Sequence, residues 1–256
     1  KLGGTRQMVS ILFADIRGFS TISERLAPER LVETLNRHMT IASDAIHRQQ
    51  GVIDKFMGDA VMAFWNAPVE VPRHAHKACE AALDMRKALR ALNAQQASAE
   101  PIAIGIGIST GPALVGNMGF EARFDYSCIG DTVNVASRLE GACKSVCYDI
   151  LVTAETRAAA SELAFLDAGS LVLKGISQPE PIHLLVGDAA LAGSEAFRAL
   201  EAAHHALLAE WAGGQGGATA LDRCRELAPA VDPKLLDFYA AALDRRADFT
   251  APQSVA

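Results

Sequence analysis

The stretch VIDKFMGDAVMAFW, residues 52–65, decides the fold of this 256-residue chain. Two apolar segments on either side of a turn at Gly58 predict a β-hairpin. A second apolar run, MVSILFA at residues 8–14, predicts a buried strand that ends at Asp15. Because we expect both hairpin arms to pair beside that strand, Asp59 in the turn should approach Asp15.

Helical and strand patterns alternate along the chain up to residue 187. Apolar residues at every third or fourth position predict amphipathic helices, and short apolar runs predict strands. These patterns indicate an α/β fold with a mostly antiparallel central sheet and helices packed on it. Helices are expected over 28–50, 78–92, 131–142 and 154–161, strands over 102–109, 126–129, 150–153, 170–173 and 182–186, and a loop over 111–124.

The chain changes character at about Asp188, where it becomes rich in Ala, Leu and Glu and loses all strand signals. A glycine-rich break, GGQGG at 213–217, interrupts this part, for which we expect two or three helices. The sequence therefore predicts a main domain over 1–187 and a helical extension over 188–256. An apolar stripe on the first of these helices should pack on the main domain: Phe197, Leu200, Leu207 and Trp211.

Composition excludes several classes of protein. The net charge is −6 with no basic block, so nucleic acid is not expected as a partner. No apolar run reaches the ~20 residues that span a bilayer, and the N-terminus has no signal-peptide pattern, so we expect a cytoplasmic protein. The chain begins at Lys1 and enters a strand pattern at once, which suggests a piece of a longer protein. A membrane anchor would then belong to segments absent from this chain.

Two acids give the first chemical signal. Asp15 and Asp59 are expected to converge, and two like charges close together cost free energy unless a cation lies between them. Mg²⁺ is commonly held by one or two carboxylates and completed by substrate phosphates. Either acid by itself also fits a plain strand end or turn. The segment DIRGFS that starts at Asp15 turns from strand into helix, and its N–H groups, with Gly18 and Phe19 among them, can cradle phosphate oxygens.

Further polar residues accompany the two acids. Asn134 and Arg138 project from one face of a predicted helix at i, i+4 spacing, and Lys55 precedes Asp59 by four residues. These residues and the two acids fall in the first three of four segments: FADIRGFSTISE (13–24), GVIDKFMGDAVMAFWNAP (51–68), YSCIGDTVNVASRLE (126–140) and LVLKG (171–175). In this order and spacing the segments resemble the signature blocks of the class III adenylyl and guanylyl cyclases. The resemblance covers roughly residues 8–186 and implies a cyclase-type, palm-like fold.

The resemblance implies a role for each matching residue. Asp15 and Asp59, with the Ile16 carbonyl, would bind two divalent cations, Mg²⁺ or Mn²⁺. It also implies a homodimer in which each active site takes residues from both chains. Further roles follow from motif position: Lys55 and Ser127 read the base, Asn134 orients the ribose, Arg138 stabilises charge in the transition state, and Lys174 binds the triphosphate. Arg123 is either a phosphate contact or a plain surface arginine.

The predicted substrate is ATP, converted to 3′,5′-cyclic AMP and pyrophosphate. The ammonium of Lys55 has donors only, so it satisfies N1 of adenine and opposes the N1–H of guanine. Ser127 departs from the Asp that many ATP-specific members carry, and in this the chain resembles a subgroup of bacterial adenylate cyclases with Ser or Thr at that position. Because a hydroxyl both donates and accepts, some use of GTP is expected. The alternatives are a guanylyl cyclase and an inactive cyclase-like module for dimerisation or sensing. The GG[DE]EF signature of diguanylate cyclases does not occur.

Overall fold

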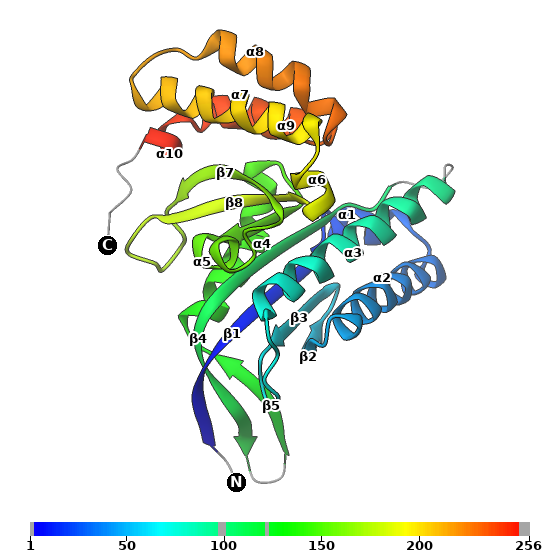
Figure 1. Ribbon diagram of the computed structural model, residues 1–256. Helices are drawn as coiled ribbons and strands as arrows, with labels where there is room; N and C mark the ends of the chain where they lie inside the picture. The colour runs from blue at the N-terminus through cyan, green and yellow to red at the C-terminus, as the bar shows by residue number, and fades with distance from the viewer. Residues whose placement is uncertain (1–2, 97–100, 121–122, 251–256) are drawn as a thin grey trace.

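A computed structural model of the protein describes residues 3–96, 101–120 and 123–250. In this part of the chain, one eight-stranded sheet has the strand order β2-β3-β1-β4-β6-β8-β7, and β5 pairs with β4 (Figure 1). The strands are β1 (Gly3–Ile16), β2 (Val52–Met57), β3 (Ala60–Trp65), β4 (Ile104–Phe120), β5 (Arg123–Ile129), β6 (Ile150–Thr153), β7 (Ala164–Leu171) and β8 (Glu180–Gly187).

Strand β1 is the centre of the sheet. It pairs antiparallel with β3 on one side and with β4 on the other, where the ladder runs from Gly3 opposite Asn117 to Ile16 opposite Ile104. Among the described strands only β4 and β6 pair in parallel. The predicted hairpin and the mostly antiparallel sheet are confirmed. The expected pairing of both hairpin arms with the first strand is wrong, because only β3 pairs with β1, and β2 lies at the edge of the sheet, paired with β3.

The expected loop over 111–124 is wrong, because β4 continues to Phe120 and β5 begins at Arg123. Glycine and proline lower strand propensity, but here the glycines permit close contact between two backbones. A Cβ at Gly116 would lie 2.2 Å from the Gly3 carbonyl oxygen, closer than any side chain can approach. The strand expected over 170–173 is present as β7, but its bounds are wrong, since β7 begins at Ala164 and ends at Leu171.

Helices cover both faces of the sheet. Successive residues of β1 point to opposite faces: Leu12 and Ala14 pack with α3, and Val9 and Ile11 join the cluster that contains Ala136 of α4. Figure 1 shows α2 and α3 together beside the sheet, with α4 placed apart from them. Helix α5 contacts α3. The bounds are α1 (Phe19–Arg25), α2 (Pro28–Arg48), α3 (His74–Gln95), α4 (Asp131–Val146) and α5 (Ala154–Ala159).

The C-terminal helices continue the core of the main domain. Phe197, Leu200, Leu207 and Trp211 are all buried in one cluster with residues of α4, β6, β7 and β8, so the predicted packing of the stripe is confirmed. The extension holds more helices than the two or three expected. They are α6 (Ala189–Ala192), α7 (Glu195–Ala212), α8 (Ala218–Leu227), a short 3₁₀ turn (Ala228–Ala230), α9 (Leu235–Asp244) and α10 (Arg246–Thr250).

Polar contacts fix the extension to the main domain. The Tyr148 hydroxyl donates to Asp232 at 2.8 Å, and Arg90 donates to the same carboxylate at 3.1 Å. On α7, His204 Nε2 lies 2.8 Å from the Asp167 carbonyl oxygen of β7. Because a carbonyl only accepts, Nε2 carries the hydrogen, and Nδ1 accepts from the Tyr239 hydroxyl at 3.0 Å.

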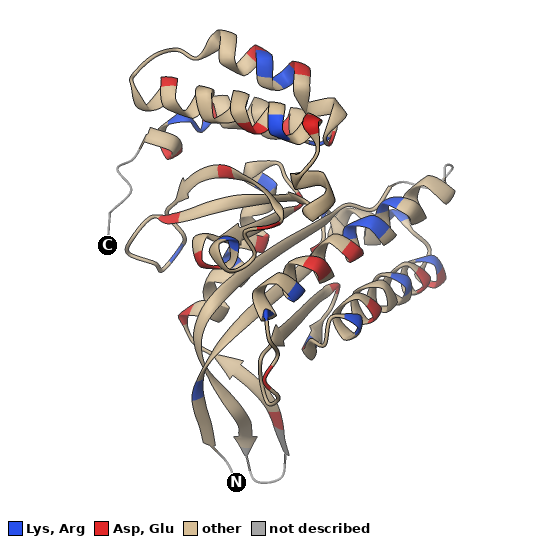
Figure 2. Ribbon diagram, in the orientation of Figure 1, with Lys and Arg blue, Asp and Glu red and all other residues tan. Residues whose placement is uncertain are grey.

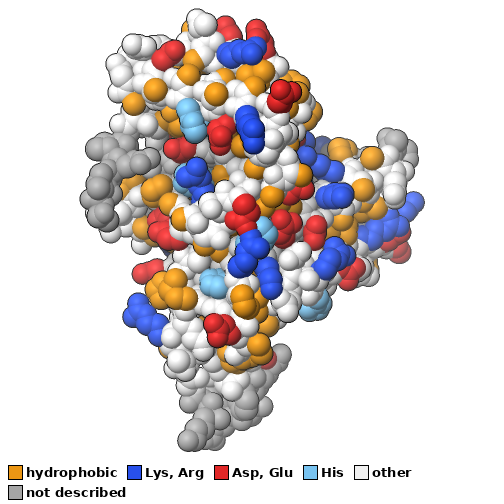
Figure 3. All heavy atoms as spheres, viewed as in Figure 1, with side chains coloured by type: hydrophobic (Ala, Val, Ile, Leu, Met, Phe, Trp, Pro, Cys, Tyr) orange, Lys and Arg blue, Asp and Glu red, His pale blue; other side chains and the backbone are white. Residues whose placement is uncertain are grey.

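Charged side chains of both signs are interspersed on the outer helices (Figure 2) and over the face drawn in Figure 3.

Within the described ranges, no helix is both long enough and apolar enough to cross a membrane.

Candidate active site

Two carboxyl groups meet at the end of β1. Asp15 lies at that end, Asp59 lies in the turn between β2 and β3, and the pairing of Ala14 with Val61 brings the two acids together. Burial, together with a hydrogen bond to Asp59 and the charge of Asp59, raises the pKa of Asp15 to about 8. Asp15 Oδ1 is buried and has no hydrogen-bond partner. The predicted convergence is confirmed, and we call these two residues the acid pair.

A third acid and an arginine lie next to the acid pair. The charge of Glu140, on α4, contributes to the raised pKa of Asp15, and burial raises the pKa of Glu140 itself. The Arg17 guanidinium opposes that shift of Glu140 and donates to the Tyr148 carbonyl at 2.6 Å. Sequence reasoning missed Glu140, because nothing in its spacing shows that it faces Asp15.

His38 supports the turn that carries Asp59. Its side chain is buried on α2, burial lowers its pKa, and it hydrogen-bonds to the backbone of Asp59. The buried imidazole therefore contacts the turn from α2 and supports it. No motif or spacing distinguishes this histidine from the other six in the chain.

The chain leaves the acid pair through a tight bend. Ile16 is the last residue of β1 and is buried, and Gly18 follows with φ 66, a left-handed conformation that favours glycine. Phe19 then begins α1. The predicted strand-to-helix turn is confirmed, and the contacts of Ile16, Gly18 and Phe19 with metal or phosphate stay predictions.

Lys55 and Ser127 are brought together by a residue that sequence reasoning missed. Asp54 is buried, with 1% of its side chain exposed, and its Oδ2 accepts from Ser127 Oγ at 2.5 Å. Its Oδ1 lies 3.6 Å from Lys55 Nζ. We call these three residues the Lys55 cluster. The two side chains predicted to read the base therefore share one carboxylate.

A further group forms around Arg138. A Cβ at Gly175 would lie 3.2 Å from Arg138 Nη2, so the Arg138 side chain packs against the turn that contains Lys174. Asn134 is exposed one helical turn earlier on α4. We call Asn134, Arg138 and Lys174 the Arg138 cluster. Arg123 lies at the start of β5, and its side chain falls outside the described part of the chain.

Helix α4 separates the Arg138 cluster from the acid pair. Glu140 faces Asp15, and two residues along a helix correspond to a rotation of about 200°. Arg138 accordingly points to the other side of α4, toward Gly175. One chain therefore presents its acids and its arginine in different directions.

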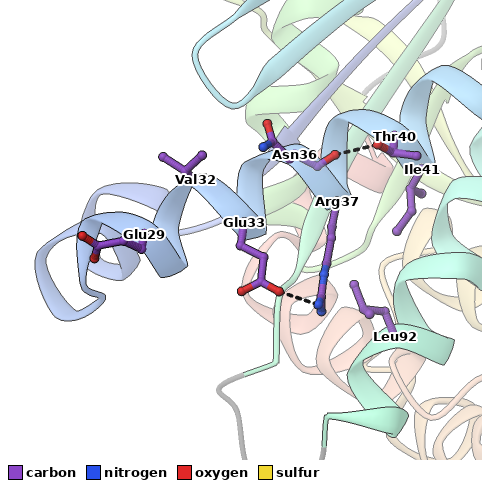
Figure 4. A pocket seen from close by; sticks show the side chains of 8 residues that line it. All are labelled: Glu29, Val32, Glu33, Asn36, Arg37, Thr40, Ile41 and Leu92. Atoms are coloured by element: carbon purple, nitrogen blue, oxygen red, sulfur yellow. Dashed lines mark hydrogen bonds and ion pairs between the residues drawn. The ribbon is translucent and has the colours of Figure 1, made fainter.

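A separate groove lies between α2 and α3 and contains none of the predicted site residues (Figure 4). Two of its charged residues, Glu33 and Arg37, bind each other at 2.6 Å. Because its lining includes no member of the acid pair, the groove is not part of the candidate site. It is lined by Glu29, Val32, Glu33, Asn36, Arg37, Thr40, Ile41 and Leu92.

Residues 4–187 match the model of a family described as the adenylate and guanylate cyclase catalytic domain. The chain belongs to this family. Over 185 residues the chain is 41% identical to adenylate cyclase 1 of Rhizobium meliloti (strain 1021), and the match covers 71% of this chain and 28% of the relative. Over 150 residues it is 39% identical to the adenylate cyclase of Anabaena cylindrica, with 58% and 30% covered. It thus spans less than a third of either relative.

Solved cyclase structures share the fold. The adenylyl cyclase CyaB from P. aeruginosa superposes with a TM-score of 0.68 at 35% identity, covering 73% of this cyclase and 97% of that chain. The guanylyl cyclase Cya2 gives a TM-score of 0.66 at 33% identity, covering 73% and 95%. The expected cyclase fold is confirmed. Because an adenylyl and a guanylyl cyclase match about equally well, base specificity has to be argued from side chains.

Proposed function

We propose that this cyclase converts ATP into 3′,5′-cyclic AMP and pyrophosphate at sites shared between two chains. The acid pair carries the proposal. Asp15 and Asp59 lie together, Asp15 Oδ1 is buried without a hydrogen-bond partner, and the pKa of Asp15 is raised. Such a pair is stabilised by a cation. Residues 1–187 would form the catalytic domain, and 188–256 a helical extension. We expect it to act in the cytoplasm, where ATP is made.

The acid pair fits divalent cations. Two carboxylates and the carbonyl of Ile16 are oxygen donors, the type that Mg²⁺ and Mn²⁺ prefer, and substrate phosphates would complete the coordination. When bound, two such ions would lower the pKa of the ribose 3′-hydroxyl and neutralise the triphosphate. Binding would also offset both the burial of the Asp15 charge and the repulsion from Asp59, which raise the pKa of Asp15.

The remaining residues would position ATP and stabilise charge. Lys55 would donate to adenine N1, and Asn134 would hold the ribose so that its 3′-oxygen lies in line with the α-phosphorus. Arg138 and Lys174 would compensate the charge that develops as pyrophosphate leaves. The reaction is an intramolecular displacement, so no covalent enzyme intermediate is required.

The direction of Arg138 supports a shared site. Within one chain it points away from the acid pair, on the other side of α4. In a two-fold symmetric dimer, the Lys55 and Arg138 clusters of one chain would complete the acid pair of the other, which gives two equivalent sites.

Mixing two inactive variants tests the shared site. Asp59→Ala and Arg138→Ala homodimers should each be nearly inactive, because both of their sites carry the lesion. In a mixed dimer, one site receives both lesions and the other receives none. With random exchange, about a quarter of wild-type activity should return, as two-fold symmetry requires. A mixture that exchanges subunits, shown by native mass spectrometry, yet stays inactive contradicts a shared site.

Measuring cyclic nucleotide formation from ATP and GTP in parallel, with Mg²⁺ and with Mn²⁺, tests the activity and the substrate. We expect kcat/KM to favour ATP. A preference for GTP would show a guanylyl cyclase instead, and no product with either nucleotide would indicate a cyclase-like module without activity.

A further inference from the structure

The Lys55 cluster contains a buried acid that the proposed reaction does not use. Asp54 has a side chain that is 1% exposed, although its neighbour Lys55 is half exposed. A buried carboxylate is costly unless its oxygens are paired. Both oxygens of Asp54 are paired, one with the Ser127 hydroxyl at 2.5 Å and one with the Lys55 ammonium at 3.6 Å.

A local irregularity of β2 aims Asp54 at this position. Ile53 pairs with Ala63 and Lys55 pairs with Met62, so two steps along β2 match one step along β3, and Asp54 is the extra residue of a bulge. In a regular strand, Asp54 and Lys55 would point to opposite faces. The bulge instead lets the carboxylate reach both Lys55 and β5.

The hydrogen bond to Asp54 fixes the direction in which Ser127 can interact. A serine hydroxyl has one hydrogen to donate and lone pairs that accept. Because an ionised carboxylate only accepts, Ser127 donates its one hydrogen to Asp54. Toward any other ligand, Ser127 Oγ then presents lone pairs alone.

We infer that Asp54 is a positioning residue that makes the cyclase select adenine over guanine by holding the Ser127 hydroxyl as an acceptor. At C6 of the purine ring, adenine carries an amino group, which donates a hydrogen bond, whereas guanine carries an oxygen, which accepts one. With Lys55 as the donor beside it, the cluster presents one acceptor and one donor, which complement the amino group and N1 of adenine. This inference rests on the proposed function.

The inference changes the expectation for GTP. A free hydroxyl at residue 127 would rotate to donate to the guanine oxygen and would tolerate both bases. The hydroxyl bound to Asp54 would instead face that oxygen with a second acceptor, which leaves a desolvated group unpaired. Use of GTP should therefore be small despite the serine.

The test is the ratio of kcat/KM for ATP to that for GTP in four proteins: wild type, Asp54→Asn, Ser127→Ala and the double variant. Asparagine keeps the shape of the side chain but can donate to Ser127, which frees the hydroxyl hydrogen. We expect Asp54→Asn to lower the ratio by about tenfold or more. In the Ser127→Ala background the same change should alter the ratio by less than about twofold, because the hydroxyl is gone.

Controls separate specificity from structure. Ser127→Thr keeps a hydroxyl beside Asp54 and should keep the ratio within about threefold of wild type. Should Asp54→Asn fail to fold by circular dichroism, Asp54→Ala gives the same readout, since it removes the acceptor and so frees the Ser127 hydrogen. A purely structural role would lower kcat/KM for both nucleotides equally and leave the ratio unchanged.

The outcomes are distinct. An unchanged ratio in a folded Asp54 variant overturns the inference and leaves the proposed function standing. A ratio that falls equally in the Ser127→Ala background also overturns it, because Asp54 would then act through Lys55. A wild-type protein that prefers GTP, or turns over neither nucleotide, contradicts the proposed function and the inference with it.

Discussion

Replacing Gly107 with alanine tests how closely helix α4 must approach the sheet. A Cβ on Gly107 would lie 2.3 Å from the Ala136 carbonyl oxygen and 2.4 Å from the Glu140 backbone nitrogen. These are backbone atoms of α4, which cannot rotate away as a side chain can. Because carbon and such atoms need about 3.5 Å, α4 must retreat by about 1 Å.

The retreat should cost both stability and rate. Overpacking of this kind typically costs about 1–3 kcal/mol of the free energy of unfolding. Since α4 carries Asn134 and Arg138, a displacement of about 1 Å should lower kcat on the order of a hundredfold. The assay is cyclic AMP formation at saturating ATP and Mn²⁺, with the melting temperature measured in parallel.

Gly141 on the same helix is the matched control. A Cβ there would meet nothing within 4 Å, so alanine fits without displacement. In a helix interior, Gly→Ala should raise the free energy of unfolding by about 0.5–1 kcal/mol and leave kcat unchanged. A Gly107→Ala protein with kcat within about threefold of wild type would refute the argument that α4 packs too tightly to accept a methyl group.

Two further predictions concern catalysis and pH. Arg138→Ala should lower kcat about a hundred- to a thousandfold with little change in KM; steady-state kinetics that show a raised KM at unchanged kcat would make it a ground-state contact. Burial lowers the pKa of His204 from 6.5 to about 4, so as pH falls below about 6.5 the unfolded state takes up the proton first and stability is lost. The free energy of unfolding should drop by about 2 kcal/mol between pH 7 and 5. Urea titrations of His204→Gln at the two pH values should not show this drop.

The strands with clear apolar runs, and the acids next to those runs, could be predicted from the sequence. The hairpin around Gly58 and the strand before Asp15 have clear apolar runs, and their pairing alone brings Asp15 to Asp59. The continuation of β4 through Gly116 could not be predicted, because its glycines serve contact with Gly3 in a distant segment.

The supporting residues of the site were missed for a related reason. Asp54 meets Ser127 across 73 positions of sequence, and only the bulge in β2 aims its side chain at that residue. Glu140 and His38 likewise act through contacts between elements far apart in the chain. Local periodicity contains no information about which distant side chain a buried polar group will meet.

The common core of the sheet and the C-terminal helices limits how this domain can be transplanted. An engineer who fuses the catalytic part to a new sensor would be inclined to cut where the family match ends, at residue 187. That cut would strip Phe197, Leu200 and Trp211 from the core they share with β7 and β8, and leave Tyr148 without its acceptor Asp232. The exposed apolar face would invite aggregation. A functional chimera should therefore retain the chain through α9 and carry the new sensor at its N-terminal end.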